Sequence, residues 1–99
     1  MDKARLNQIL GAIPKGRWAS YADVAVAAGG TVQHARALNG ILTRGGHRNA
    51  HRVLLANGAV ASTALGDPEA VRLRLEGEGL VFEAGRAPEG KRWRPPAAA

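Results

Sequence analysis

The side chains best suited to catalysis or metal binding in this chain are three histidines, His34, His47 and His51, and two serines, Ser20 and Ser62. The histidines do not have the spacing of a zinc site, and the 99 residues contain no cysteine to complete one, so we expect no metal and no other cofactor. Neither serine lies in a Gly-x-Ser-x-Gly turn, the usual setting of a hydrolase nucleophile. Disulfides and thiol nucleophiles are excluded within this sequence.

A histidine and an arginine follow an alanine in the stretch Asn49–Val53, which reads Asn-Ala-His-Arg-Val. A histidine beside a nucleophile can act as a general base, but the methyl group of Ala50 has no proton to give up and no lone pair. His51 is then either a base with nothing to activate or a partly buried histidine that is hydrogen-bonded within the protein. Both interpretations stay open from the residues alone.

The net charge of the chain is +6, from 14 basic and 8 acidic residues, and most of the basic excess is arginine. Such a surface attracts polyanions, and nucleic acid is the first partner to consider, although a high-GC genome gives the same arginine bias. Apolar residues make up 45% of the chain and aromatic residues 4%, which favours short helices packed in one domain through aliphatic side chains. No apolar run has the length of a membrane helix, and we expect a cytoplasmic protein with no membrane partner.

The elements that must position these residues are indicated by capping residues and glycines. Helices are predicted at about 2–13, 20–28 and 31–44, with Ser20 and Thr31 as caps of the second and third. Glycine pairs at 29–30 and 45–46 end the second and third helices, because glycine tolerates positive φ. Two short helices joined by a tight turn form a helix-turn-helix, in which residues 31–44 are the recognition helix.

One face of this third helix is apolar, and a second face is available to a partner. The second face carries Gln33, Arg36 and Gly40. A glycine within a helix costs about 1 kcal/mol relative to alanine, so Gly40 indicates a close approach to the helix backbone, either by DNA or by another helix. Arg36 occupies the half of the helix where recognition helices place base-contacting side chains, and a solvated arginine is the alternative.

The second half of the chain is predicted to add a small β-wing and another helix. Residues 53–55 and 59–60 flank the turn signal Asn57-Gly58, which favours a hairpin. A helix should begin after Asp67 and stop near residues 77–79, and residues 80–82 and 91–93 are predicted to pair as a terminal ribbon, with Trp93 over the core. The expected fold is mainly α with a small β-wing, a winged helix-turn-helix-like single domain over 1–94 with a frayed tail at 95–99.

Several short motifs occur in the order seen in one known family. They are Ile13-Pro14-Lys15-Gly16, Ser20-Tyr21, Ala35-Arg36-Ala37-Leu38-Asn39-Gly40, Ala50-His51-Arg52-Val53, Asn57-Gly58-Ala59-Val60 and Leu75-Glu76-Gly77-Glu78-Gly79. Over roughly residues 3–80 the chain resembles the DNA-binding domain of the O6-alkylguanine-DNA alkyltransferases. In that family the pentapeptide is Pro-Cys-His-Arg-Val, and its cysteine accepts the alkyl group; here Ala50 stands at that position.

The resemblance is therefore to the alkyltransferase-like proteins, a non-enzymatic branch of the family. It implies a monomer that binds double-stranded DNA containing O6-alkylguanine, flips the damaged base without transferring the alkyl group, and hands the lesion to nucleotide excision repair proteins. Its location would be the cytoplasm of a bacterial-type cell, on the nucleoid when bound to DNA. His51 and Glu78 would be the remnant of the catalytic network and would shape the pocket by hydrogen bonding.

The resemblance also assigns DNA-binding roles to individual residues. It implies that Arg36 enters the base stack in place of the flipped guanine and that Tyr21 crowds the target phosphate, with docking from the minor groove. Core packing is the alternative role for the tyrosine. The helix starts at Ser20 and Thr31 would offer N–H groups to phosphates. The predicted DNA-binding set is Tyr21, Arg36, Ser20, Thr31, Gln33 and Gly40.

A lesion pocket is implied around the alanine, formed in part by the 61–65 segment and with more room than a cysteine would leave. The predicted pocket set is Tyr21, Leu42, Ala50, His51, Val53, Ser62, Thr63 and Ala64. The chain departs from the family at Asn49, which replaces a proline, in a shorter loop at 45–48, and at Thr63 and Ala64, which replace a tyrosine and a serine. Two other functions remain open: a winged-helix transcription regulator that binds undamaged DNA, and a lyase or glycosylase that uses His51 and Glu78.

Overall fold

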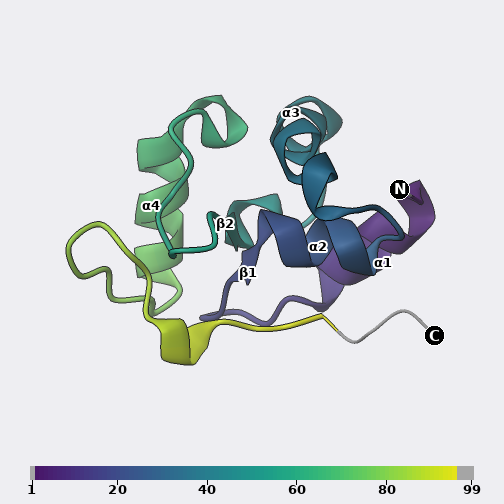
Figure 1. The fold of residues 1–99 in the computed structure, drawn as a ribbon. Coiled ribbons are helices and arrows are strands. Elements are labelled where there is room, and N and C mark those ends of the chain that lie inside the picture. Colours follow the sequence, from purple (N-terminus) through teal and green to yellow (C-terminus); the bar gives the residue numbers. More distant parts are fainter. Residues whose placement is uncertain (1, 96–99) are drawn as a thin grey trace.

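The predicted caps begin the helices of the structure, a computed structural model that describes residues 2–95 (Figure 1). The side chains of Asp2, Ser20 and Asp67 each accept a hydrogen bond from the backbone N–H three residues on, at 3.1 Å. In chain order the elements of the described residues are α1 Lys3–Ala12, β1 Ala19–Ser20, α2 Tyr21–Ala27, α3 Ala35–Gly45, β2 Val53–Leu54 and α4 Pro68–Gly77, with short 3-10 turns at Val32–His34, Ala50–Arg52, Ala64–Gly66 and Glu89–Lys91.

The predicted third helix is divided into two parts. A 3-10 turn at Val32–His34 precedes α3, because the ring Nδ1 of His34 accepts the backbone N–H of Thr31 at 2.8 Å and tightens the first turn. The helix ends as expected, since Gly46 has a φ of 60°. The predicted helix is therefore a short 3-10 turn, preceded by the extended Thr31, that leads directly into α3.

The predicted β-hairpin is wrong in its pairing. β1 and β2 form a parallel pair in which Ala19 lies opposite Val53 and Ser20 opposite Leu54. The turn at Asn57-Gly58 does form, with Gly58 at φ 86°, but Ala59 bridges Arg86 instead of extending a ladder with β2. Val53 and Leu54 are both fully buried, and a strand buried on both faces suits a parallel pair within the core better than an exposed wing.

The predicted terminal ribbon is also wrong, because residues 91–93 pair with Trp18 instead of with residues 80–82. The backbone N–H of Trp18 donates to Lys91 at 3.2 Å, and that of Trp93 donates to Trp18 at 2.6 Å. The fully buried indole of Trp18 donates its Nε1–H to the carbonyl of Pro88 at 2.8 Å, which fixes the returning chain against β1. Trp93 does pack against the core, as expected.

The expected fold class, a mainly helical single domain with a small β component, is confirmed. In Figure 1, α4 lies on one side of the central β pair, and α1, α2 and α3 lie on the other, while the C-terminal segment passes beneath. None of the helices between residues 2 and 95 combines the length and apolar character needed to cross a membrane. The predicted frayed tail lies, apart from Pro95, outside the described residues.

Candidate nucleic-acid interface

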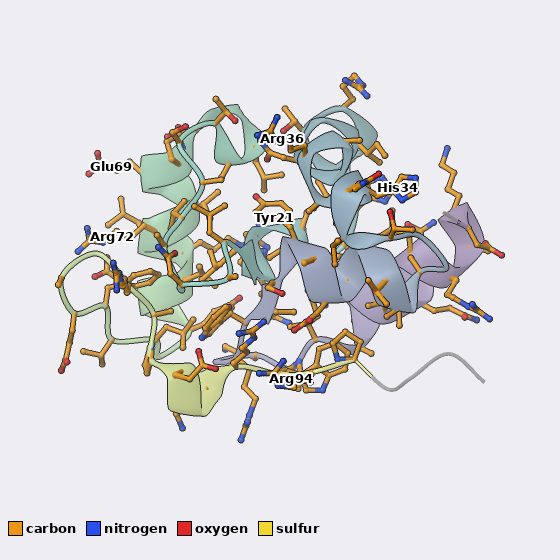
Figure 2. The ribbon with its side chains drawn as sticks, viewed as in Figure 1. Tyr21, His34, Arg36, Glu69, Arg72 and Arg94 are labelled. Carbon is orange, nitrogen blue, oxygen red and sulfur yellow. The ribbon has the colours of Figure 1, made fainter. Side chains whose placement is uncertain are left out.

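A hollow of about 270 Å³ opens between α2, α3 and the segment that follows β2. It is lined by Tyr21, Ala35, Arg36, Asn39, Leu55 and Ala61. Its walls are largely apolar, with a phenol, an amide and a guanidinium as the polar groups, and this is the usual makeup of a site that binds a flat organic group. Figure 2 shows Tyr21 beneath the start of α3 and Arg36 between α3 and the turn that precedes α4.

Tyr21 forms the buried wall of the hollow. Its hydroxyl donates a hydrogen bond to the Oδ1 of Asn39 at 3.2 Å, and the Nδ2 of Asn39 donates to the Oγ1 of Thr63 at 2.7 Å. Burial raises the pKa of Tyr21 to about 12, so the phenol is neutral at any physiological pH. The ring presents an apolar face to the hollow while its hydroxyl is held by the protein.

Arg36 is exposed at the mouth of the hollow, and within residues 2–95 its guanidinium forms no salt bridge. A guanidinium that is not engaged by the protein keeps its donors for a ligand and can stack on a base. Arg44 and Arg48 are also exposed on α3 and the turn after it. The α3 side of the molecule therefore offers several cations to a polyanion.

His51, Arg52 and Glu78 form a hydrogen-bond network. The Nε2–H of His51 donates to Glu78 at 2.8 Å, and Arg52 donates two hydrogen bonds to the same carboxylate at 2.9 Å and a third to the carbonyl of Ile13 at 2.8 Å. Ala50 lies buried beside them. The network connects the turn that contains Ala50 with the end of α4 and the end of α1.

Burial and hydrogen bonding fix the charges of this network. Burial would raise the pKa of Glu78, but the hydrogen bonds from Arg52 and His51 outweigh it and lower the pKa to about 2. Burial lowers the pKa of His51, and the hydrogen bond to Glu78 only partly offsets this. At neutral pH the group is thus a neutral imidazole and a carboxylate–guanidinium pair.

The predicted DNA-binding residues differ in how accessible they are. Gln33 and Thr31 are exposed, but the backbone N–H of Thr31 is used by His34. The hydroxyl of Ser20 is fully buried and accepts from the backbone of Asp23 and from Arg92, both at 3.1 Å, so it serves the protein interior.

Gly40 lies on the accessible side of α3. A Cβ built on this glycine would have three atoms of the Arg44 guanidinium as its nearest neighbours, at 3.2 to 3.8 Å. The atoms closest to Gly40 thus belong to a flexible side chain of the same helix, which a partner can displace.

Most of the predicted pocket residues lie below the hollow or beside it. Tyr21 lines the hollow, whereas the buried members of the set belong to the core beneath, and Ser62 and Thr63 are exposed next to the mouth. The buried members are Leu42, Ala50, His51, Val53 and Ala64. Ala61, which belongs to the expected 61–65 segment, lines the hollow, whereas sequence reasoning missed three lining residues, Ala35, Asn39 and Leu55. The spacing could have identified Asn39, because it lies three residues after Arg36 and shares its helix face.

Comparison with known proteins identifies a family, a sequence relative and a solved structure with the same fold. Residues 3–80 match the family described as "6-O-methylguanine DNA methyltransferase, DNA binding domain". The bifunctional methyltransferase/endonuclease of Picrophilus torridus is 35% identical over 92 residues, which cover 90% of this chain and only 30% of that protein's length. The solved structure of S. pombe Atl1 in complex with damaged DNA containing O6-carboxymethylguanine has a TM-score of 0.74 and 21% identity, covering 93% of this chain and 94% of that chain.

Proposed function

The chain belongs to the family of the 6-O-methylguanine DNA methyltransferase DNA-binding domain, and on that premise we propose that it binds duplex DNA containing O6-alkylguanine without removing the alkyl group. The observation that carries this proposal is the hollow lined by Arg36, which combines an apolar wall, a neutral tyrosine and a guanidinium that forms no salt bridge within residues 2–95. Atl1, which shares the fold, was solved with damaged DNA of this kind.

The hollow suits a single base turned out of the duplex. A flipped guanine needs a flat apolar wall, which Tyr21 and Leu55 provide, and the gap that it leaves in the duplex needs a filler. Arg36 stands at the mouth, where its planar guanidinium can enter the stack and hydrogen-bond the unpaired cytosine. The lack of a side chain at Gly40 lets the phosphate chain approach α3 closely, and the net charge of +6 adds salt-dependent affinity.

Alkyl transfer is not part of the proposal, because these 99 residues contain no thiol. The methyl group of Ala50 stands where the family's acceptor sulfur would be, and the neutral His51 donates its Nε2–H to Glu78. A histidine held in this way orients the turn that contains Ala50, but it has no alkyl-accepting nucleophile to activate. The enzymatic activities named for the Picrophilus relative are those of a protein more than three times as long.

A lesion that is bound and left unrepaired requires a second repair activity. We place this protein upstream of nucleotide excision repair, as a monomer that marks the alkylated base in the cytoplasm of a bacterial-type cell. The marking works through a long-lived complex, so the rate of dissociation from the lesion is the quantity that matters for the partner.

Competition between an O6-methylguanine duplex and the same duplex with guanine tests the proposal. We expect preference for the alkylated duplex, which is recovered with its alkyl group intact. Arg36→Ala should reduce that preference more than it weakens binding to plain DNA, whereas Arg72→Ala, which removes an exposed charge from α4, should leave the preference unchanged. If Arg36→Ala loses the same factor of affinity for both duplexes, Arg36 is an ordinary phosphate contact. Release of the free base by the wild-type protein would indicate a glycosylase.

A further inference from the structure

Asn39 joins three separate elements around the hollow. Its Oδ1 accepts the hydroxyl of Tyr21 at the start of α2, and its Nδ2 donates to the hydroxyl of Thr63 in the segment before α4. The two distances are 3.2 Å and 2.7 Å. Because both ends of the amide are engaged by the protein, Asn39 holds the walls of the hollow together.

The segment of residues 61–66 is anchored in the core by the buried Ala61 and Ala64, and the hydrogen bond from Asn39 to Thr63 joins its exposed side to α3. Its backbone hydrogen bonds are local, from Ala64 to Ala61 and from Gly66 to Thr63, at 3.0 and 3.1 Å. Leu65 has a φ of 50°, a conformation that costs a non-glycine residue energy and that packing around it must maintain. Ala61 lines the hollow, so any movement of this segment changes the width of the opening.

We propose that Asn39 is a specificity-determining residue, which sets the size of the O6 substituent that the hollow accepts by tying Thr63 to Tyr21. This inference rests on the proposed function. The tie keeps the 61–66 segment close to α3 and the opening narrow, so small substituents are held tightly and large ones must displace the segment. Loss of this hydrogen bond frees the exposed part of the segment at Thr63, while Ala61 and Ala64 stay in the core, and favours the larger substituents.

Thr63 allows this to be tested without disturbing the core, because it is exposed. Thr63→Val keeps the shape of the side chain and removes the hydrogen-bond acceptor, whereas Thr63→Ser keeps the hydroxyl and should rescue the wild-type behaviour. Asn39→Leu breaks the tie at its centre, and Tyr21→Phe removes only the other hydrogen bond. Thermal unfolding checks that each variant is folded.

The measurement is the ratio of affinities for two duplexes, one with O6-benzylguanine and one with O6-methylguanine. We expect this ratio to rise about two- to tenfold in Thr63→Val and in Asn39→Leu, the size of effect that the loss of one hydrogen bond produces, and to stay at the wild-type value in Thr63→Ser. The ratio of affinities in the double variant Thr63→Val/Asn39→Leu should change no more than in either single variant, because both substitutions remove the same hydrogen bond.

The outcomes separate this inference from the proposed function. If Thr63→Val and Asn39→Leu bind both alkylated duplexes with the wild-type ratio, Asn39 does not set substituent size, although lesion binding stands. If the wild-type protein binds neither alkylated duplex more tightly than undamaged DNA, the proposed function itself fails. A uniform loss of affinity in all folded variants would also overturn the inference, because it would show a role in stability without selectivity.

Discussion

Replacing Glu78 with glutamine should remove a large part of the stability of this small domain. The side chain is only 11% exposed, and its carboxylate accepts two hydrogen bonds from Arg52 and one from His51. Glutamine has nearly the same shape but no charge, so the largely buried guanidinium of Arg52 loses its counter-ion. The turn that contains Ala50 would then lose its main connection to α4.

The size of the effect follows from the titration of the carboxyl. The pKa of Glu78 is lowered from 4.5 to about 2, because the hydrogen bonds from Arg52 and His51 outweigh the effect of burial, and at about 1.4 kcal/mol per unit this corresponds to about 3 kcal/mol of free energy of unfolding. On acidification the unfolded state takes up this proton first, since its carboxyl titrates near pH 4.5. The stabilisation is therefore complete above pH 4.5 and is lost as the pH falls towards 2.

Urea unfolding followed by tryptophan fluorescence measures this directly, because Trp18 is fully buried. We expect Glu78→Gln to lower the free energy of unfolding by about 3 kcal/mol at pH 7, and the difference from the wild type to shrink between pH 4.5 and pH 3. Glu76→Gln is the matched control, since Glu76 is 40% exposed and its single pair with Arg72 spans 3.8 Å; we expect a change below about 0.5 kcal/mol. Equal effects of the two variants, or a difference for Glu78→Gln that does not change with pH, would refute the reasoning.

Two further predictions concern the interface. Gly40→Ala should raise the free energy of unfolding by about 1 kcal/mol, because alanine favours a helix and the atoms nearest to the added methyl group belong to the flexible end of Arg44. The same variant should bind DNA more weakly, because the methyl group obstructs the phosphate chain. Urea unfolding and DNA titration measure the two effects, and an unchanged DNA affinity would show that Gly40 is not part of the interface. Tyr21 is the single tyrosine, so the absorbance of tyrosinate reports on it alone. Tyrosinate should appear near pH 12 in the folded protein and near pH 10 in urea, and the free energy of unfolding should fall between these two pH values. A midpoint of 10 in both the folded and the urea-unfolded protein would contradict the burial of the hydroxyl.

The helices could be predicted from the sequence because their boundaries are determined locally. Asp2, Ser20 and Asp67 form their cap hydrogen bonds within three residues, and Gly46 ends α3 through its own backbone conformation. The β pairings could not be predicted in this way. The turn at Asn57-Gly58 favours a hairpin, but β2 is buried on both faces and pairs with β1, far away in the chain. Pairing of Trp18 with the C-terminal segment is equally non-local.

The candidate site likewise has residues that sequence motifs identify and residues that only the packing of distant segments brings together. Tyr21 and Arg36 were named through a family motif, and the structure brings both to one hollow. The predicted pocket around Ala50 follows the position of the family's reactive cysteine, whereas the hollow itself depends on how α3 packs against the segment after β2. Leu55 reaches the hollow only through that packing, and a leucine at this position carries no local signal of it.

The central claim is recognition of an alkylated base, and one equilibrium measurement tests it most directly. The wild-type protein is titrated with a duplex that contains one O6-methylguanine, in competition with the same duplex containing guanine, at about 150 mM salt so that phosphate contacts do not dominate. We predict a preference for the alkylated duplex of about tenfold or more, which is about 1.4 kcal/mol. Equal affinity for the two duplexes would contradict the claim and would favour a regulator that binds undamaged DNA.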